Sequence, residues 1–100
     1  MATVQGTLDQ PLEDAAVATR RAAGSQGYSI REGESAPNVL VFKKESTRFS
    51  WGSQLTVVLS SISPTQTRLT ITTKEKWALA EWGRGRHAAR RLLDEMGAQH

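Results

Sequence analysis

The chain has 100 residues, with 13 lysines and arginines against 10 aspartates and glutamates, a formal charge of +3, and no cysteine. This length makes one domain, residues 1–100, and the lack of cysteine excludes a disulfide framework, a thiolate zinc site and a cysteine nucleophile. No apolar run approaches the roughly 18 residues that a membrane span needs, and the start of the chain lacks the features of a signal peptide, so we expect a cytoplasmic protein.

The first part of the chain predicts a strand followed by a helix. From Ala2 to Leu8, small or apolar residues alternate with threonine and glutamine, as in a strand with one buried face. Asp9 is a candidate helix N-cap, and Gly24 is a candidate C-terminal stop. The apolar face of the helix is mostly alanine, which predicts close packing on whatever it covers: Leu12, Ala15, Ala16, Thr19, Ala22 and Ala23.

Four further strands are expected, joined by short polar segments. They cover residues 28–32, 39–43, 54–62 and 67–75. Short connections make neighbouring strands antiparallel, so these four predict a meander. The strand at 28–32 is short and carries Arg31 and Glu32, which predicts an edge position. The pattern does not place the first strand in the sheet.

The last element is an amphipathic helix over Arg84–Met96, ended by Gly97. Its apolar stripe includes Gly85, where a missing side chain would allow close approach to the sheet. The rest of the stripe is Ala88, Ala89, Leu92, Leu93 and Met96.

The element order β-α-β-β-β-β-α predicts a two-layer α+β domain. An antiparallel meander of about five strands would carry both helices on one face, because each helix must bury its apolar stripe. The opposite face would be open and rich in hydroxyl groups. Its expected residues are Thr3, Gln5, Thr7, Ser29, Arg31, Thr56, Ser60, Thr70 and Thr72.

Two motifs add a resemblance to this element order. Phe49-Ser50-Trp51-Gly52 precedes a hydrophobic strand, and Trp82-Gly83-Arg84-Gly85-Arg86 opens the last helix. In motif and order the chain resembles small bacterial domains built like a cut-down helix-grip (START-like) fold. The resemblance implies a β-meander closed by a C-terminal helix, with a ligand groove between that helix and the sheet.

Candidate catalytic and metal-binding residues are few. His87 falls on the predicted solvent face of the last helix, and His100 ends the sequence. A metal site needs several converging ligands, and His87 has only Asp94 or Glu95 within a turn or two. His87 also lacks a partner nucleophile. We therefore expect no cofactor, no metal and no enzymatic activity.

A basic cluster is the best charged candidate. Residues 51–100 hold seven basic against four acidic side chains, so the net charge resides in this half. The cluster could bind phosphate groups, or it could be a solvated helix face with pairs Arg90–Asp94 and Arg91–Glu95 at helical spacing. Its candidate anion-binding residues are Lys74, Lys76, Arg84, Arg86, Arg90 and Arg91.

Apolar side chains near the predicted helix start form the other candidate site. Trp51, Trp77, Leu79 and Trp82 either plug the ends of an alanine-lined core or line an exposed groove or interface. The leading hypothesis is a small, non-enzymatic binding or protein-interaction domain that takes a small apolar ligand, a protein partner or a second copy. It would use either a groove between the sheet and the last helix or the open, threonine-rich face of the sheet. The alternative is binding of nucleic acid or another anionic surface through the basic C-terminal helix.

Overall fold

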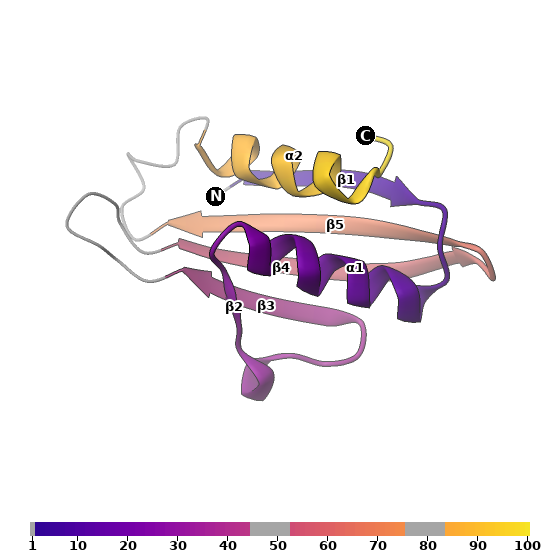
Figure 1. Ribbon diagram of the computed structural model, residues 1–100, viewed down its shortest axis with the longest axis horizontal. Coiled ribbons are helices and arrows are strands. Elements are labelled where there is room, and N and C mark those ends of the chain that lie inside the picture. The colour runs from indigo at the N-terminus through magenta and orange to yellow at the C-terminus, as the bar shows by residue number, and fades with distance from the viewer. Residues whose placement is uncertain (1, 45–52, 76–83) are drawn as a thin grey trace.

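The computed structural model describes residues 2–44, 53–75 and 84–100 (Figure 1). Two helices and a sheet occur in the order predicted from the sequence. The elements are β1 (Ala2–Leu8), α1 (Leu12–Ser25), β2 (Ser29–Ile30), the 3-10 turn η1 (Glu32–Glu34), β3 (Val39–Lys44), β4 (Ser53–Ser63), β5 (Gln66–Glu75) and α2 (Arg84–Met96).

The sheet has five strands in the order β1-β5-β4-β3-β2, and every neighbouring pair is antiparallel. Strands β2 to β5 form the predicted meander. Strand β1, which the sequence pattern left unplaced, pairs with β5, so that Val4 lies opposite Ile71. The edge position predicted for the second strand is confirmed, although β2 is shorter than the predicted strand because the chain turns into η1.

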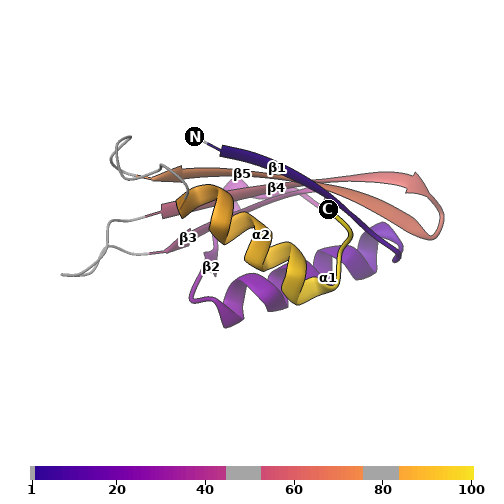
Figure 2. The ribbon, with the colours of Figure 1, turned by 90° about the horizontal axis from the view of Figure 1, so that it is seen from above.

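Both helices lie on one face of the sheet, as Figures 1 and 2 show. Helix α2 contacts β1 and β5, while α1 contacts β4 and packs beside α2. The two predicted apolar stripes provide the buried residues of these helices, so the two-layer α+β prediction is confirmed. The core between the layers includes Ala15, Ala22, Ala23, Leu40, Phe42, Leu55, Val57, Leu59, Leu69, Ile71, Ala89, Leu92 and Leu93.

The predicted N-cap of α1 is wrong. Pro11 occupies the N-cap position, and the Ala15 N–H donates to its carbonyl at 2.9 Å. The Asp9 carboxylate instead accepts a hydrogen bond from Gln66 Nε2 at 2.9 Å. Asp9 therefore fastens the connection between β1 and α1 to the start of β5.

Both helices end on a glycine with positive φ. Helix α1 ends at Ser25, one residue past the predicted stop at Gly24, and the residue after its C-cap is Gly27, whose φ is +89°. The Gly27 N–H donates to the Gly24 carbonyl and the Tyr28 N–H to the Ala23 carbonyl, the hydrogen bonds of a Schellman motif. Helix α2 ends in the same way at Gly97, φ +73°, as predicted.

The close approach of α2 to the sheet occurs at Gly6 of β1. A Cβ added to Gly6 would lie 2.8 Å from Leu93 Cδ2 and 3.1 Å from the Gln99 carbonyl oxygen. Gln99 is held there because its backbone exchanges hydrogen bonds of 2.7 and 2.8 Å with Thr7. The glycine predicted for this role, Gly85, has a position in α2, but its surroundings lie outside the described part of the chain.

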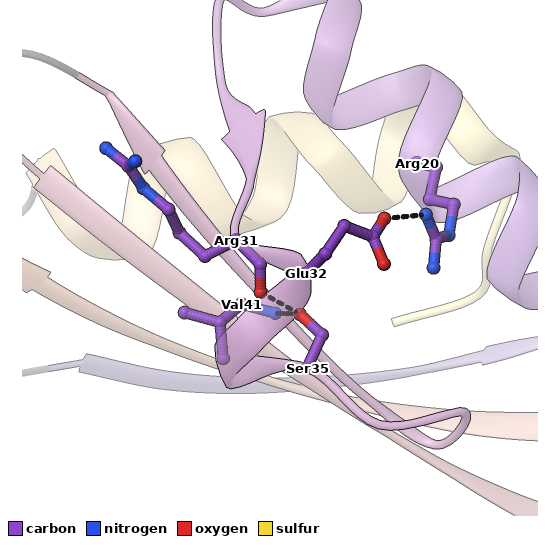
Figure 3. Close-up of polar contacts among 5 residues, drawn as sticks. All are labelled: Arg20, Arg31, Glu32, Ser35 and Val41. Atoms are coloured by element: carbon purple, nitrogen blue, oxygen red, sulfur yellow. Dashed lines mark hydrogen bonds and ion pairs between the residues drawn. The ribbon is translucent and has the colours of Figure 1, made fainter.

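The segment around η1 connects the helix layer to the sheet (Figure 3). Arg20 of α1 forms an exposed ion pair with Glu32 at 2.7 Å. The Ser35 hydroxyl accepts a hydrogen bond from the Val41 N–H at 3.0 Å and donates to the Arg31 carbonyl at 2.8 Å. These bonds take the place of the sheet pairing that a longer second strand would make.

Candidate functional site

Most of the predicted site residues fall outside the described part of the chain. This holds for the whole candidate groove of Trp51, Trp77, Leu79 and Trp82, and for Lys76. Arg84 and Arg86 belong to α2, but their side chains are also outside it. The apolar groove of these residues therefore stays a prediction.

Three residues of the predicted basic cluster have described side chains, and all three are exposed. Lys74 pairs with Gln54 in the register of β4 and β5, next to the buried pair Leu55 and Thr73. Side chains alternate along a strand, so Lys74 points to the open face of the sheet. Arg90 and Arg91 lie on α2, over the other face. A binding surface that combines these cations stays a prediction.

The described residues enclose an open groove of about 720 Å³ between the end of α1 and the side of α2. The end of β3 and the residue before β2 complete its walls. The sequence pattern indicated the lining residues from α2, namely His87, Ala88, Arg91, Asp94 and Glu95, but not that they face the end of α1 and the end of β3. The lining residues are Ser25, Gln26, Tyr28, Lys44, His87, Ala88, Arg91, Asp94 and Glu95.

Tyr28 and Lys44 form one wall of this groove. The Tyr28 ring is partly buried against the core, and the Lys44 ammonium lies 5.4 Å from its centroid. That spacing is in the range of a cation–π contact. Gly27 lies beside the lysine stem, since a Cβ at Gly27 would lie at van der Waals distance, 3.4 Å, from Lys44 Cε. The Schellman end of α1 therefore borders the contact between the Lys44 ammonium and the Tyr28 ring.

Glu95 connects the two helices at the bottom of the groove. Its carboxylate accepts hydrogen bonds from the Ser25 hydroxyl and, at 2.9 Å, from Gln26 Nε2. These two bonds, with a smaller contribution from the charge of Arg91, hold the pKa of Glu95 below its ordinary value. Glu95 is therefore ionised over a wide pH range and acts as an acceptor for groups of α1.

The predicted pairs Arg90–Asp94 and Arg91–Glu95 do not form among the described side chains. Asp94 instead lies 2.7 Å from Nε2 of His100, and Glu95 bonds to the end of α1. Asp94 meets His100 because α2 ends at Gly97 and the residues after it turn back beside Asp94. Neither Arg90 nor Arg91 forms an ion pair with an acidic side chain of the described residues, although the charge of Arg91 acts on Glu95.

A second groove of about 570 Å³ lies between α1 and α2 beyond the Ser25–Glu95 contact. Its lining carries opposite charges, Asp14 and Arg21, next to the exposed apolar Val17. It also lacks an aromatic ring within the described residues. The first groove is thus chemically the more distinctive of the two.

Within residues 2–44, 53–75 and 84–100, no group of three or more histidine, aspartate or glutamate side chains could hold a metal ion. Over the same ranges, no helix has the length and apolar character to cross a membrane.

No protein-family model matches the sequence, and no curated protein is similar to it in sequence. Among solved structures, the fold is similar to that of the di-domain ARO/CYC StfQ from the steffimycin biosynthetic pathway, with a TM-score of 0.60. The alignment covers 96% of this chain and 43% of that protein, at 8% identity. At this identity the likeness shows the fold alone, and it supports a helix-grip-like α+β architecture.

Proposed function

We propose that this chain is a small ligand-binding domain whose site is the groove between the end of α1 and α2. The observation that carries the proposal is the groove itself: about 720 Å³, with the Tyr28 ring and the Lys44 and Arg91 cations on its walls. Ligand sites typically occupy roughly 300–1,000 Å³ and combine apolar contact area with a few polar groups.

The packing of the core supports a site at the ends of the helices rather than beneath α2. Leu92 and Leu93 of α2 have no exposed surface, and neither does Leu69 of the underlying strand. The alanines of the α1 stripe, Ala15, Ala22 and Ala23, are buried in the same core. The space between these helices and the sheet is thus filled by side chains, and the open volume lies beside it, in the groove next to the Schellman motif of α1.

The proposal is for binding, and it rests on the groove rather than on the fold. The solved neighbour is titled an ARO/CYC, so catalysis is compatible with this architecture. The groove offers cations, a phenol ring and two carboxylates that already accept hydrogen bonds. This set favours holding a ligand over transforming one.

A titration followed by amide NMR tests the proposal. The uncharged probe 2-naphthamide is expected to shift the amides of Gln26, Tyr28, Lys44 and Ala88. Ala88→Trp fills the groove and should abolish these shifts. The matched control Val17→Trp, on the second groove, should leave them in place. Shifts confined to the open sheet face, or shifts unchanged in Ala88→Trp, contradict the proposal.

The second candidate function is binding of nucleic acid through α2. The observation that favours it is that Arg90 and Arg91 are exposed and form no ion pair with the other described side chains. A gel-shift assay at two salt concentrations tests it, because phosphate contacts lose affinity steeply with salt. Retardation that is lost at higher salt and in an Arg90→Gln, Arg91→Gln double variant supports this candidate. No retardation at low salt rejects it.

A further inference from the structure

We infer that the groove selects an organic anion, namely a small planar molecule whose carboxylate is held by Lys44 and Arg91 while its ring packs against Tyr28. This inference rests on the proposed function, since it names the chemistry of a ligand for the same groove. It draws on three observations: where the cations come from, which acceptors are already used, and what apolar surface lies beside them.

The cations converge on the groove from two different elements. Lys44 comes from the end of β3, and Arg91 from the middle of α2. His87 lies one helical turn before Arg91, so the two share a face of α2 toward the groove. Ammonium and guanidinium groups carry only donors, and the guanidinium fork matches both oxygens of a carboxylate.

The acidic residues of the groove already have partners inside the protein. Glu95 accepts from the Ser25 hydroxyl and from Gln26 Nε2, and Asp94 lies 2.7 Å from Nε2 of His100. In contrast, the ion pairs among the described side chains include neither Lys44 nor Arg91. The two cations of the groove can therefore each take a new anionic partner, which favours an anionic group on the ligand.

The apolar contact in the groove is aromatic. The partly buried Tyr28 ring lies next to Lys44, so a ligand ring can contact Tyr28 while its carboxylate reaches the ammonium. A flat molecule with an acidic group at one edge fits this pairing of ring and cation. The carboxylates of Asp94 and Glu95 repel such a ligand, so we expect a moderate preference for the anion rather than an absolute one.

The experiment compares two probes of the same shape, 2-naphthoate and 2-naphthamide, by calorimetry and amide NMR at low salt. We expect 2-naphthoate to bind about tenfold more tightly, the size of effect that one or two partly exposed charge-assisted hydrogen bonds give. Raising the salt concentration should shrink this preference and leave the binding of 2-naphthamide nearly unchanged.

Lys44→Gln and Arg91→Gln should each remove most of the preference for 2-naphthoate while 2-naphthamide still binds. The matched control is Lys43→Gln, the adjacent residue of the same strand. The Lys43 side chain points to the opposite face of the sheet and pairs with Glu34 at 3.3 Å. This variant should keep the full preference.

The outcomes separate the inference from the proposed function. If 2-naphthamide binds in the groove and 2-naphthoate binds no better, the inference is wrong and the proposed function stands. If neither probe shifts groove amides, the proposed function itself is wrong. If Lys43→Gln and Lys44→Gln reduce the preference for 2-naphthoate equally, the binding is diffuse electrostatic attraction and the inference is overturned. The same holds if a thymidine oligonucleotide displaces 2-naphthoate from α2.

Discussion

Replacing Gly6 by alanine tests how closely α2 packs on the sheet. The new methyl group would lie 2.8 Å from Leu93 Cδ2 and 3.0 Å from Leu93 Cδ1. Both distances are far below ordinary van der Waals contact, and Leu93 is fully buried, so it cannot swing into solvent. The third close atom, the Gln99 carbonyl oxygen at 3.1 Å, belongs to backbone that is hydrogen-bonded to Thr7.

The size of the effect follows from two opposing contributions. Overpacking a filled site costs about 1–3 kcal/mol. Alanine also restricts the unfolded chain, which stabilises the folded state by about 0.4–1 kcal/mol where the conformation allows it. The expected net loss for Gly6→Ala is therefore about 1–2 kcal/mol of unfolding free energy.

Gly24→Ala is the matched control, because it introduces the same methyl group with nothing within 4 Å of it. Gly24 is exposed within α1, so this variant should be more stable than the parent by about 0.5–1 kcal/mol. Both free energies are measured by urea unfolding followed by far-ultraviolet circular dichroism. The difference between the two variants isolates the packing contribution.

A compensating substitution checks that Leu93 is the source of the clash. Leu93→Val removes both δ-methyl positions, so the double variant Gly6→Ala, Leu93→Val should lose at least 0.5 kcal/mol less than the sum of the single losses, on the order expected for residues in contact. Strictly additive losses, or a Gly6→Ala variant as stable as the parent, would refute this account of the α2–β1 contact.

Three further substitutions test individual contacts, each by urea unfolding. Gly27→Ala should lower the free energy of unfolding by about 1–2 kcal/mol, because the φ of +89° at this position is strained for any side chain. A variant as stable as the parent would argue against the Schellman motif at the end of α1. Thr67→Val should lower the free energy of unfolding by about 1–2 kcal/mol, since the buried Thr67 hydroxyl donates to the Gln10 carbonyl at 2.9 Å. An unchanged midpoint of urea unfolding would contradict that hydrogen bond. The lowered pKa of Glu95 contributes stability that is fully present above its ordinary pKa of 4.5 and is lost as pH falls through the lowered value. The Glu95→Gln variant should not show this loss of unfolding free energy below pH 4.5. If the unfolding free energy falls with pH in the same way in parent and variant, the Glu95 carboxylate does not contribute this stability.

The features that the sequence predicted well are those that depend on local periodicity. The stripe that includes Ala15 and Ala22, and the stripe that includes Leu92 and Leu93, follow from helical spacing, and all four residues are buried. The element order and the shared face for both helices follow from these stripes, because each stripe needs an apolar surface to cover it.

The features that it predicted poorly depend on side-chain hydrogen bonds outside the regular elements. Asp9 is a good N-cap residue by type, but its carboxylate accepts a hydrogen bond from Gln66, at the start of the neighbouring strand β5. The second strand stops early because the Ser35 hydroxyl, in the loop after η1, accepts the Val41 N–H of β3, a bond that periodicity does not register. In both cases a side-chain hydrogen bond, and not the local residue pattern, decides the structure.

The groove escaped prediction for the same reason. Its walls come from three stretches of the chain, represented by Tyr28, Lys44 and Arg91. These stretches are far apart in the sequence, and the packing of the end of α1, the end of β3 and α2 brings them together. The sequence signal for the groove was the position of Arg91 next to the apolar stripe of α2, where the side of a helix can border a groove.

The pairing of β1 with β5 sets the order in which this protein can be assembled. Gln5 of β1 pairs with Thr70 of β5, so β1 gains its neighbour only after β2, β3, β4 and β5 have been synthesised. Until then Ala2–Leu8 is a strand-forming segment without charge, the kind that invites pairing with other chains. Contacts this distant in sequence also slow folding. We expect β2 to β5 to form first during synthesis, with the docking of β1 completing the domain.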